Sequence, residues 1–412
     1  MAEISNQVLT KKILFISHDA NRAGGQIVLL QLLRQLKQHN LPMHLLLCSD
    51  GPLEDEFREI LPTTRLPRLG DVHFSPFLEK FLSFFSLSSW VKQQVLNRRW
   101  IRFQSTLRSQ NIGLIFANTI AAAASYRQLD FITAPTILFA HELEMSIQKF
   151  SAPADMAYLM SRTNHLIVVS RAVASYFQKT YQYPENQIST FQIIDTPLIL
   201  KNIEEGRKTA IRQKLGLPAN AILVGGCGHA EWRKGNDIFM MAAQQVIKHF
   251  ADKPVYFVWV GMREDSELYE VQRFDARRMG LDDRIIHVGL TSHVFQYLSQ
   301  FDIFALTSRE DPYPLVVLET ALAEKPIVCF EKAGGAPELV EEDAGFVVPY
   351  LDVFEMSRRI IELIDNPELR LKMGKNAKRK VLERHPTAQS VNNVMEIINK
   401  LCASKSSNYG SS

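Results

Sequence analysis

Short apolar runs alternate with segments of helical periodicity along most of this chain of 412 residues. Apolar runs without polar alternation are typical of parallel strands that are buried on both faces of a sheet. Strand–helix alternation over this length predicts two doubly wound α/β units, each long enough to bury its own core. The expected strands are 12–17, 43–48, 114–118, 136–141 and 165–170, and then 221–226, 255–261, 285–289, 302–307, 326–330 and 345–348.

A polar segment near 195–215 interrupts this pattern and marks the best place for a domain boundary. The sequence thus predicts an N-terminal Rossmann-like domain over 1–200 and a C-terminal Rossmann-like domain over 201–384. Ligands of open α/β sheets bind outside the carboxyl ends of the strands, so we expect the two sheets to face each other across a cleft that holds the chemistry. The last residues, 403–412, are polar and predict a flexible tail.

The composition excludes several classes of protein. Hydrophobic residues make up 46% of the chain and charged residues 22%, as in globular proteins. The formal charge of +3 is too small to indicate nucleic-acid binding. There is no uninterrupted apolar stretch of about 18 residues and no signal peptide, so we expect a cytoplasmic protein. The four cysteines lie far apart without CxxC spacing, which favours reduced thiols.

Two carboxylates, Asp311 and Glu319, stand eight positions apart in the stretch T-S-R-E-D-P-Y-P-L-V-V-L-E. Because prolines follow Asp311 and Tyr313, residues 308–313 should form an extended loop after a strand, and a helix should then run to about Glu324. On that helix Glu319 borders an apolar stripe, where a carboxylate needs a hydrogen-bonding partner. Either a sugar hydroxyl or the side chain of a structural Lys or Arg could be that partner.

Glycines and cations follow two strands of the second unit. Gly334 and Gly335 come after the run 326–330 and precede a helix start, so their N–H groups can bind an anion, with a well-formed turn as the alternative. Arg233 and Lys234 stand between a strand and a helix in W-R-K-G. Adjacent cations at this place fit a diphosphate, and two solvated surface cations are the alternative.

The first unit contributes two candidates. Gly25 lies where a strand-end loop meets a helix, and His141 follows the run T-I-L-F-A, at the expected cleft. A lone histidine is often structural, but this position makes His141 the strongest candidate among the histidines. The absence of G-x-G-x-x-G argues against a dehydrogenase. No H-E-x-x-H or strand-end D-x-D indicates a metal site, and the acidic run 54–56 is expected on a helix surface.

The combination of S-R-E-D-P-Y-P-L-V-V-L-E with W-R-K-G and G-G-A-P-E resembles the retaining glycosyltransferases of family 4, the glycosyl transferases group 1. The resemblance is strongest over 220–350 and implies the GT-B fold of two facing Rossmann-like domains. Asp311 stands where this family usually has Glu; Glu310 is its neighbour, but the spacing to Glu319 selects Asp311. Two stretches depart from the family pattern: C-G-H-A, where many relatives carry an Arg, and F-Q-I-I-D-T-P, which lacks an asparagine–glycine turn.

The resemblance implies an enzyme of the hexosyltransferase type, as in polysaccharide biosynthesis. It would move a sugar from a nucleotide-diphosphate sugar to a glycan, lipid or small-molecule acceptor with retention, without metal and without a cofactor. It also implies that a final helix, 385–401, crosses back to the first domain. The implied catalytic residues are Asp311, His141 and Glu319, and the implied donor-binding residues are Arg233, Lys234, Gly25, Gly334, Gly335, Glu319 and Tyr313.

Two other functions stay open: a sugar-nucleotide epimerase of the same fold, and a catalytically silent nucleotide-sugar-binding or scaffold protein. The segment 77–103 mixes aromatic residues with Lys92, Arg98, Arg99 and Arg102. This pattern predicts a helix that either lies on a membrane surface or packs its apolar side against the core. In the first case the protein would sit at the inner face of the membrane as a peripheral protein.

Overall fold

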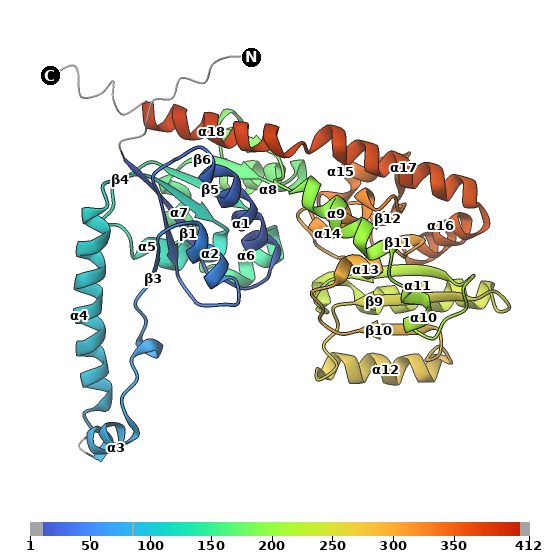
Figure 1. Cartoon of the computed structure of the whole chain (residues 1–412), viewed down its shortest axis with the longest axis horizontal. Helices are drawn as coiled ribbons and strands as arrows, with labels where there is room; N and C mark the ends of the chain where they lie inside the picture. Colours follow the sequence, from blue (N-terminus) through green and yellow to red (C-terminus); the bar gives the residue numbers. More distant parts are fainter. Residues whose placement is uncertain (1–10, 85, 404–412) are drawn as a thin grey trace.

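Two parallel sheets form the framework of the protein in the computed structural model, which describes residues 11–84 and 86–403 (Figure 1). The strand order is β3-β2-β1-β4-β5-β6-β7 in the first sheet and β10-β9-β8-β11-β12-β13 in the second. The first sheet consists of β1 Lys12–Ser17, β2 Met43–Leu47, β3 Thr63–Arg65, β4 Ile112–Asn118, β5 Thr136–Ala140, β6 Thr163–Val168 and β7 Ile188–Thr190. The second consists of β8 Ile222–Cys227, β9 Val255–Val260, β10 Ile285–Val288, β11 Ile303–Leu306, β12 Ile327–Phe330 and β13 Gly345–Val348.

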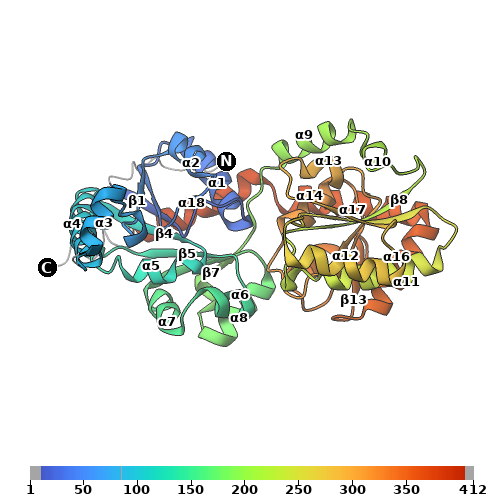
Figure 2. The same cartoon turned by 90° about the horizontal axis from the view of Figure 1, so that it is seen from below.

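Helices lie on both sides of each sheet, which is why the central strands are apolar along their length (Figure 2). Every residue of β2 and of β5 is buried. The helices that precede residue 190 are α1 Gly24–Lys37, α2 Glu54–Ile60, α3 Pro76–Phe84, α4 Ser88–Ser109, α5 Ala123–Arg127, α6 Glu144–Phe150, α7 Pro153–Arg162 and α8 Arg171–Tyr181. Those that follow are α9 Thr196–Arg207, α10 Ile211–Lys214, α11 Asn236–His249, α12 Glu267–Met279, α13 Val294–Leu298, α14 Leu315–Leu322, α15 Ala336–Val340, α16 Val353–Asp365, α17 Pro367–Arg384 and α18 Thr387–Ala403.

The predicted α/β class with two parallel sheets is confirmed. Every strand expected from an apolar run is present, and its ends differ from the expected ones by about two residues or fewer. The strands β3 and β7 were not predicted. Each pairs with only one described neighbour, at an edge of the first sheet, and is partly exposed. Such short edge strands need no continuous apolar run, so periodicity does not reveal them.

Two local expectations are corrected. Helix α14 ends at Leu322 instead of about Glu324, because Glu324 has a φ of +63° and cannot continue the helix. Glu54 was expected on a helix surface, but it is buried. Its carboxylate accepts hydrogen bonds from the guanidinium groups of Arg58 and Arg65, which compensate the cost of burying the charge.

Helix α18 leaves the side of the second sheet and packs on the first, against α1 and β4 (Figure 1). The hydroxyl of Thr387 donates to the Ile194 carbonyl at 2.7 Å, and the hydroxyl of Ser390 donates to the Gln192 carbonyl at 2.9 Å. The C-terminal helix therefore fastens the two halves of the chain to each other. The tail expected over 403–412 lies, apart from the last residue of α18, outside the described residues.

Helix α9 follows the first sheet in sequence but packs against α13 and α14 of the second half. We therefore propose that the boundary between the domains lies just before α9, close to the expected division at residue 200. Within residues 11–84 and 86–403, no helix has both the length and the apolar character needed to cross a bilayer.

Candidate active site

A cluster of charged side chains lies at the carboxyl ends of strands in the second sheet. The Lys234 Nζ is 2.5 Å from Asp311 Oδ2, and an Arg233 guanidinium nitrogen is 3.4 Å from Asp311 Oδ1. The side chain of Asp311 is only 7% exposed and that of Lys234 13%. Burial raises the pKa of Asp311, but attraction to the two cations outweighs burial, and the net pKa is lowered. Asp311 is therefore an ionised, buried carboxylate that binds both cations.

Glycines at two points of the β8–α11 connection make room for these cations. The single turn Trp232–Lys234 ends at Gly235, which has a φ of +67°, and a Cβ there would lie 2.0 Å from the Thr307 carbonyl oxygen. Gly228, with a φ of +145°, lies beside Lys234, and a Cβ there would approach the lysine chain to 3.3 Å. The chain after β8 can thus turn sharply and bring the cations against the neighbouring strand end.

The loop after β11 is fixed by contacts with the loop after β12. The Asp311 N–H donates to the Ala333 carbonyl at 2.6 Å, and Asp311 forms an isolated parallel bridge with Gly334. A Cβ at Gly334, whose φ is +138°, would lie 1.8 Å from the Asp311 carbonyl oxygen, so this position requires glycine. The Ser308 hydroxyl donates to Asp311 Oδ2 at 3.1 Å. Backbone and side-chain contacts therefore both determine the position of the Asp311 carboxylate.

Gly335 and Tyr313, both expected at the donor, lie at the junction between the two halves. The Gly335 N–H donates to the Pro312 carbonyl at 2.9 Å, and a Cβ on Gly335 would meet Ser170 at 2.7 Å. The Tyr313 hydroxyl is 3.0 Å from His385 Nε2, and its ring is buried. The Gly335 N–H and the Tyr313 hydroxyl are therefore occupied by protein partners.

Glu319, on α14, approaches the same strand end as the cations. Burial raises the pKa of Glu319 to about 7, and no other described side chain bonds its carboxylate. The thiol of Cys227, at the end of β8, is close enough to feel the charges of both Glu319 and Lys234. Cys227 thus marks the point where these residues converge. Burial raises the pKa of Cys227 to about 12, so the thiol stays protonated.

A second group of side chains lies at the carboxyl ends of strands in the first sheet. The His141 Nε2 is 3.0 Å from Asn118 Oδ1, and Asn118 Nδ2 donates to the Gly25 carbonyl at 3.1 Å. A Cβ on Gly25 would lie 2.9 Å from Thr119 and 3.4 Å from the ring of His141. Burial lowers the pKa of His141 to about 3, so the imidazole is neutral. The structure brings Gly25 and His141 together and adds Asn118, which sequence analysis missed.

Glu310 connects the two groups. Its carboxylate accepts hydrogen bonds from the N–H of Met145 at 3.0 Å and the N–H of Ser146 at 3.2 Å, at the start of α6. Arg233 donates to the Glu310 carbonyl at 2.8 Å. The side chain of Glu310 therefore contacts the first half of the chain, whereas that of Asp311 contacts the cations of the second half.

Glu338 makes a second contact of the same kind. Its carboxylate accepts from the N–H of Ala172 at 3.1 Å, in the first turn of α8. Beside it, the Ser170 hydroxyl donates to the Pro312 carbonyl at 2.7 Å. Two acidic residues of the second half thus bind backbone N–H groups at two helix starts of the first half, where the helix dipole favours negative charge.

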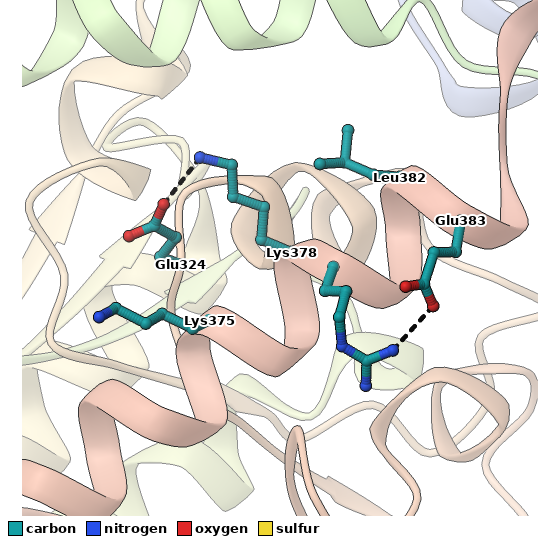
Figure 3. A pocket seen from close by; sticks show the side chains of 6 residues that line it. Glu324, Lys375, Lys378, Leu382 and Glu383 are labelled. Atoms are coloured by element: carbon teal, nitrogen blue, oxygen red, sulfur yellow. Dashed lines mark hydrogen bonds and ion pairs between the residues drawn. The ribbon is translucent and has the colours of Figure 1, made fainter.

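Two surface pockets lie away from this cluster. One, of about 360 Å³, is lined by Glu324, Lys375, Lys378, Arg379, Leu382 and Glu383 (Figure 3). The other, of about 410 Å³, is lined by Leu200, Ile203, Glu204, Arg207, Lys208, Leu322 and Lys378. In the first pocket Lys378 is paired with Glu324 at 2.7 Å, and Arg379 is paired with Glu383 at 2.8 Å. Neither pocket contains a candidate site residue, so the charged cluster and not a cavity identifies the site.

The second half of the chain is similar in sequence to known glycosyltransferases. Residues 207–380 match the family model described as glycosyl transferases group 1. An alpha-D-kanosaminyltransferase from Streptomyces kanamyceticus is 29% identical over 176 residues, which is 42% of this chain and 44% of that protein. A GDP-mannose-dependent monoacylated alpha-(1-6)-phosphatidylinositol monomannoside mannosyltransferase from Corynebacterium glutamicum is 29% identical over 178 residues, or 40% of this chain and 44% of that protein. The chain therefore matches less than half the length of these relatives.

The likeness in fold extends over almost the whole chain. The crystal structure of HepE from Anabaena, in complex with UDP and glucose, superimposes with a TM-score of 0.74 at 22% sequence identity and covers 94% of this chain and 99% of that one. Two parallel α/β sheets in this arrangement define a GT-B fold, as the sequence predicts. At the level of sequence, residues 207–380 match the glycosyl transferases group 1, the family that the motifs resemble.

Proposed function

We propose that this protein is a retaining hexosyltransferase that uses a nucleotide-diphosphate sugar, without a metal ion, to glycosylate a hydroxyl of a glycan, lipid or small molecule. The observation that carries the proposal is the placement of Lys234 and Arg233 around the buried Asp311, at the carboxyl end of the second sheet. The match of residues 207–380 to the glycosyl transferases group 1, and the UDP and glucose bound by HepE, support the same reaction class.

The two cations suit a leaving diphosphate. Lys234 supplies a compact point charge and Arg233 a planar fork of N–H donors. In the free protein Asp311 binds both, and Glu231 also pairs with Arg233 at 3.0 Å. Incoming phosphates would compete with Asp311 for Lys234. Since the cations are already in place, little reorganisation is needed when negative charge develops on the departing diphosphate.

The remaining donor contacts come from backbone and carboxyl groups. Within the described residues the Gly334 N–H has no acceptor, so in our proposal this N–H binds a phosphate oxygen, whereas the Gly335 N–H is already bonded. Glu319 would bind the ribose hydroxyls, because a carboxyl with a pKa of about 7 both donates and accepts hydrogen bonds near neutral pH. We leave Tyr313 out of the donor site, since its hydroxyl contacts His385.

His141 would contact the transferred sugar as a neutral imidazole. The amide nitrogen of Asn118 donates to the Gly25 carbonyl, so its oxygen faces His141 and accepts from Nε2–H. This arrangement leaves Nδ1 of His141 as an acceptor for a sugar hydroxyl. The Gly25 loop, which touches the ring, would close over the diphosphate from the first domain.

The proposed transfer needs no protein nucleophile. The bond between the anomeric carbon and the diphosphate oxygen breaks, and the acceptor oxygen forms a new bond on the same face of the sugar. The acceptor proton passes to the oxygen of the leaving diphosphate, so charge and atoms balance. Lys234, Arg233 and the Gly334 N–H stabilise the diphosphate, and Asp311 and His141 orient the sugar.

A donor screen tests this proposal. Thermal-shift assays with UDP-, GDP- and ADP-sugars should reveal one class that raises the melting temperature, because it binds only the native state. The same donor should be hydrolysed slowly, and Lys234→Ala should lower that rate at least about 100-fold. Lys253→Ala, at a half-exposed lysine paired with Asp365, is the matched control and should keep the full rate.

The screen also separates the alternatives. Donor binding without hydrolysis or transfer would instead indicate a nucleotide-sugar-binding or scaffold protein. Conversion of the sugar to an isomer with no acceptor present would indicate an epimerase. A melting temperature unchanged by every donor would overturn the proposed site.

A further inference from the structure

A helical arm projects from the first half of the protein and extends away from both sheets (Figure 1). The arm, residues 76–84 and 86–99, consists of α3 and the N-terminal half of α4, and Ser86, with a φ of +55°, lies between the two helices. The far end of α4 is anchored in the core by Phe103 and Leu107. The sequence predicted one helical segment here, but the chain folds back on itself and forms a tip.

The tip of the arm exposes large apolar side chains. Phe77 is 82% exposed, Phe84 84% and Trp90 62%, and Leu87 between them is 44% exposed. Of the described side chains of the arm, Leu82 alone is buried. A cluster of large apolar side chains that stays in water on a projecting element marks an interaction surface.

Polar contacts join the two helices of the arm. The Glu79 carboxylate accepts hydrogen bonds from the Ser88 hydroxyl at 2.9 Å and from Lys92 Nζ at 2.7 Å. These contacts connect α3 with the start of α4. Replacement of Phe77 and Trp90 leaves the three polar side chains in place.

The arm and the rest of α4 are strongly basic. Lys80 is exposed beside the tip, and four exposed arginines continue along α4, whereas Glu79, which pairs with Lys92, is the one acidic residue in the two helices. The basic residues of these two helices are Lys80, Lys92, Arg98, Arg99, Arg102 and Arg108. Long cationic side chains beside aromatic rings match an anionic lipid surface, where the rings enter the headgroup region and the cations contact lipid phosphates.

We infer that the arm docks the protein on an anionic lipid bilayer, with Phe77, Phe84 and Trp90 inserted at the level of the headgroups. A second copy of this chain is a poorer occupant of the tip, because two arms with the same excess of positive charge repel each other. The docking surface is separate from the charged cluster at Asp311, so its test requires no glycosyl transfer.

Vesicle co-sedimentation tests the inference. The protein should sediment with vesicles of phosphatidylcholine mixed with phosphatidylglycerol and bind at least about tenfold more weakly to phosphatidylcholine alone. Binding should weaken as salt is raised from about 0.15 M to about 0.5 M, because salt screens the lipid charge. Phe77→Ser with Trp90→Ser should lower binding to the anionic vesicles at least about tenfold.

Matched controls distinguish docking from a folding defect and from non-specific hydrophobic binding. Phe274→Ser with Phe354→Ser removes two exposed rings outside the arm, which are 56% and 70% exposed, and should leave binding unchanged. Arg98→Glu with Arg102→Glu should weaken binding to anionic vesicles while the melting temperature stays the same.

Three results would overturn the inference: no sedimentation with anionic vesicles, equal binding by the Phe77→Ser, Trp90→Ser variant, or a concentration-dependent dimer that this variant abolishes. The last result would assign the tip to self-association instead.

Discussion

The Oδ1 atom of Asn118 lies 3.0 Å from Nε2 of His141, and the other end of the same amide donates to the Gly25 carbonyl. The second bond determines which way the amide points, and the first then determines which imidazole nitrogen carries the proton. Asn118 therefore acts on the candidate sugar contact through His141 and is a positioning residue in the proposed site.

Asn118→Ala should lower kcat/KM for donor hydrolysis roughly tenfold, because the imidazole loses the acceptor that holds its proton at Nε2. Asn118→Asp should change the pH profile, since a carboxylate beside His141 favours the imidazolium and raises its pKa. Activity of that variant should then fall as the pH drops through the raised pKa. Both effects are measured as pH–rate profiles; an Asn118→Ala profile identical to that of the wild type would remove Asn118 from the site.

Asp311→Asn should separate binding from turnover. Asp311 holds Lys234 and Arg233 in the free protein, so a diphosphate must displace its charge. The neutral amide should therefore bind a nucleoside diphosphate several-fold more tightly, although turnover of the complete donor falls at least about 100-fold. Isothermal titration calorimetry and donor-hydrolysis assays give the two quantities. Weaker binding of the nucleoside diphosphate by Asp311→Asn would contradict the competition.

Part of the charged cluster could be predicted from the sequence. Lys234 and Asp311 lie in motifs 77 positions apart, but each motif follows an apolar run, and the ends of parallel strands meet at one edge of a sheet. Strand prediction was therefore enough to place both residues in one region. Their direct ion pair was not predicted, because it depends on how two irregular loops fold over Gly235 and Gly334.

The contacts of Asn118 and Glu310 could not be predicted from the sequence. Asn118 closes a strand, and no spacing in the sequence connects it with His141, since their contact arises only because β4 pairs with β5. Glu310 and Asp311 are neighbours in an extended loop, where successive side chains point to opposite sides. The spacing to Glu319 selected Asp311 but gave no role to Glu310, whose partners lie on the other half of the chain.

Glu319→Gln should change how stability depends on pH. The folded-state pKa of Glu319 is raised from 4.5 to about 7, so the folded protein holds a proton that the unfolded chain releases near pH 4.5. Below pH 4.5 the bound proton makes its full contribution to the stability of the wild type. This contribution is lost as the pH rises through about 7, whereas the glutamine variant has no such pH dependence. One pKa unit corresponds to about 1.4 kcal/mol, so the difference should reach roughly 3 kcal/mol in favour of Glu319→Gln at pH 8.

Urea unfolding of both proteins at pH 4.5 and pH 8 measures this difference. Burial also raises the pKa of Glu142 to about 7, and this contribution is the same in both proteins and cancels in the comparison. A stability difference that does not change between the two pH values would show that the pKa of Glu319 is not raised in the folded state.

Glu310→Ala should loosen the junction between the two halves. The variant loses the bonds to the N–H groups of Met145 and Ser146, while the Glu338 contact and helix α18 remain. Small-angle scattering should show a larger radius of gyration, and KM for the donor should rise roughly tenfold with a smaller change in kcat, because fewer molecules have the two groups aligned. Glu310→Gln keeps an acceptor and should recover most of the loss. Glu331→Ala is the control, at a half-exposed acid after β12 that pairs with Lys332. Equal KM values for Glu310→Ala and the wild type would show that Glu310 does not hold the two halves in the reactive arrangement.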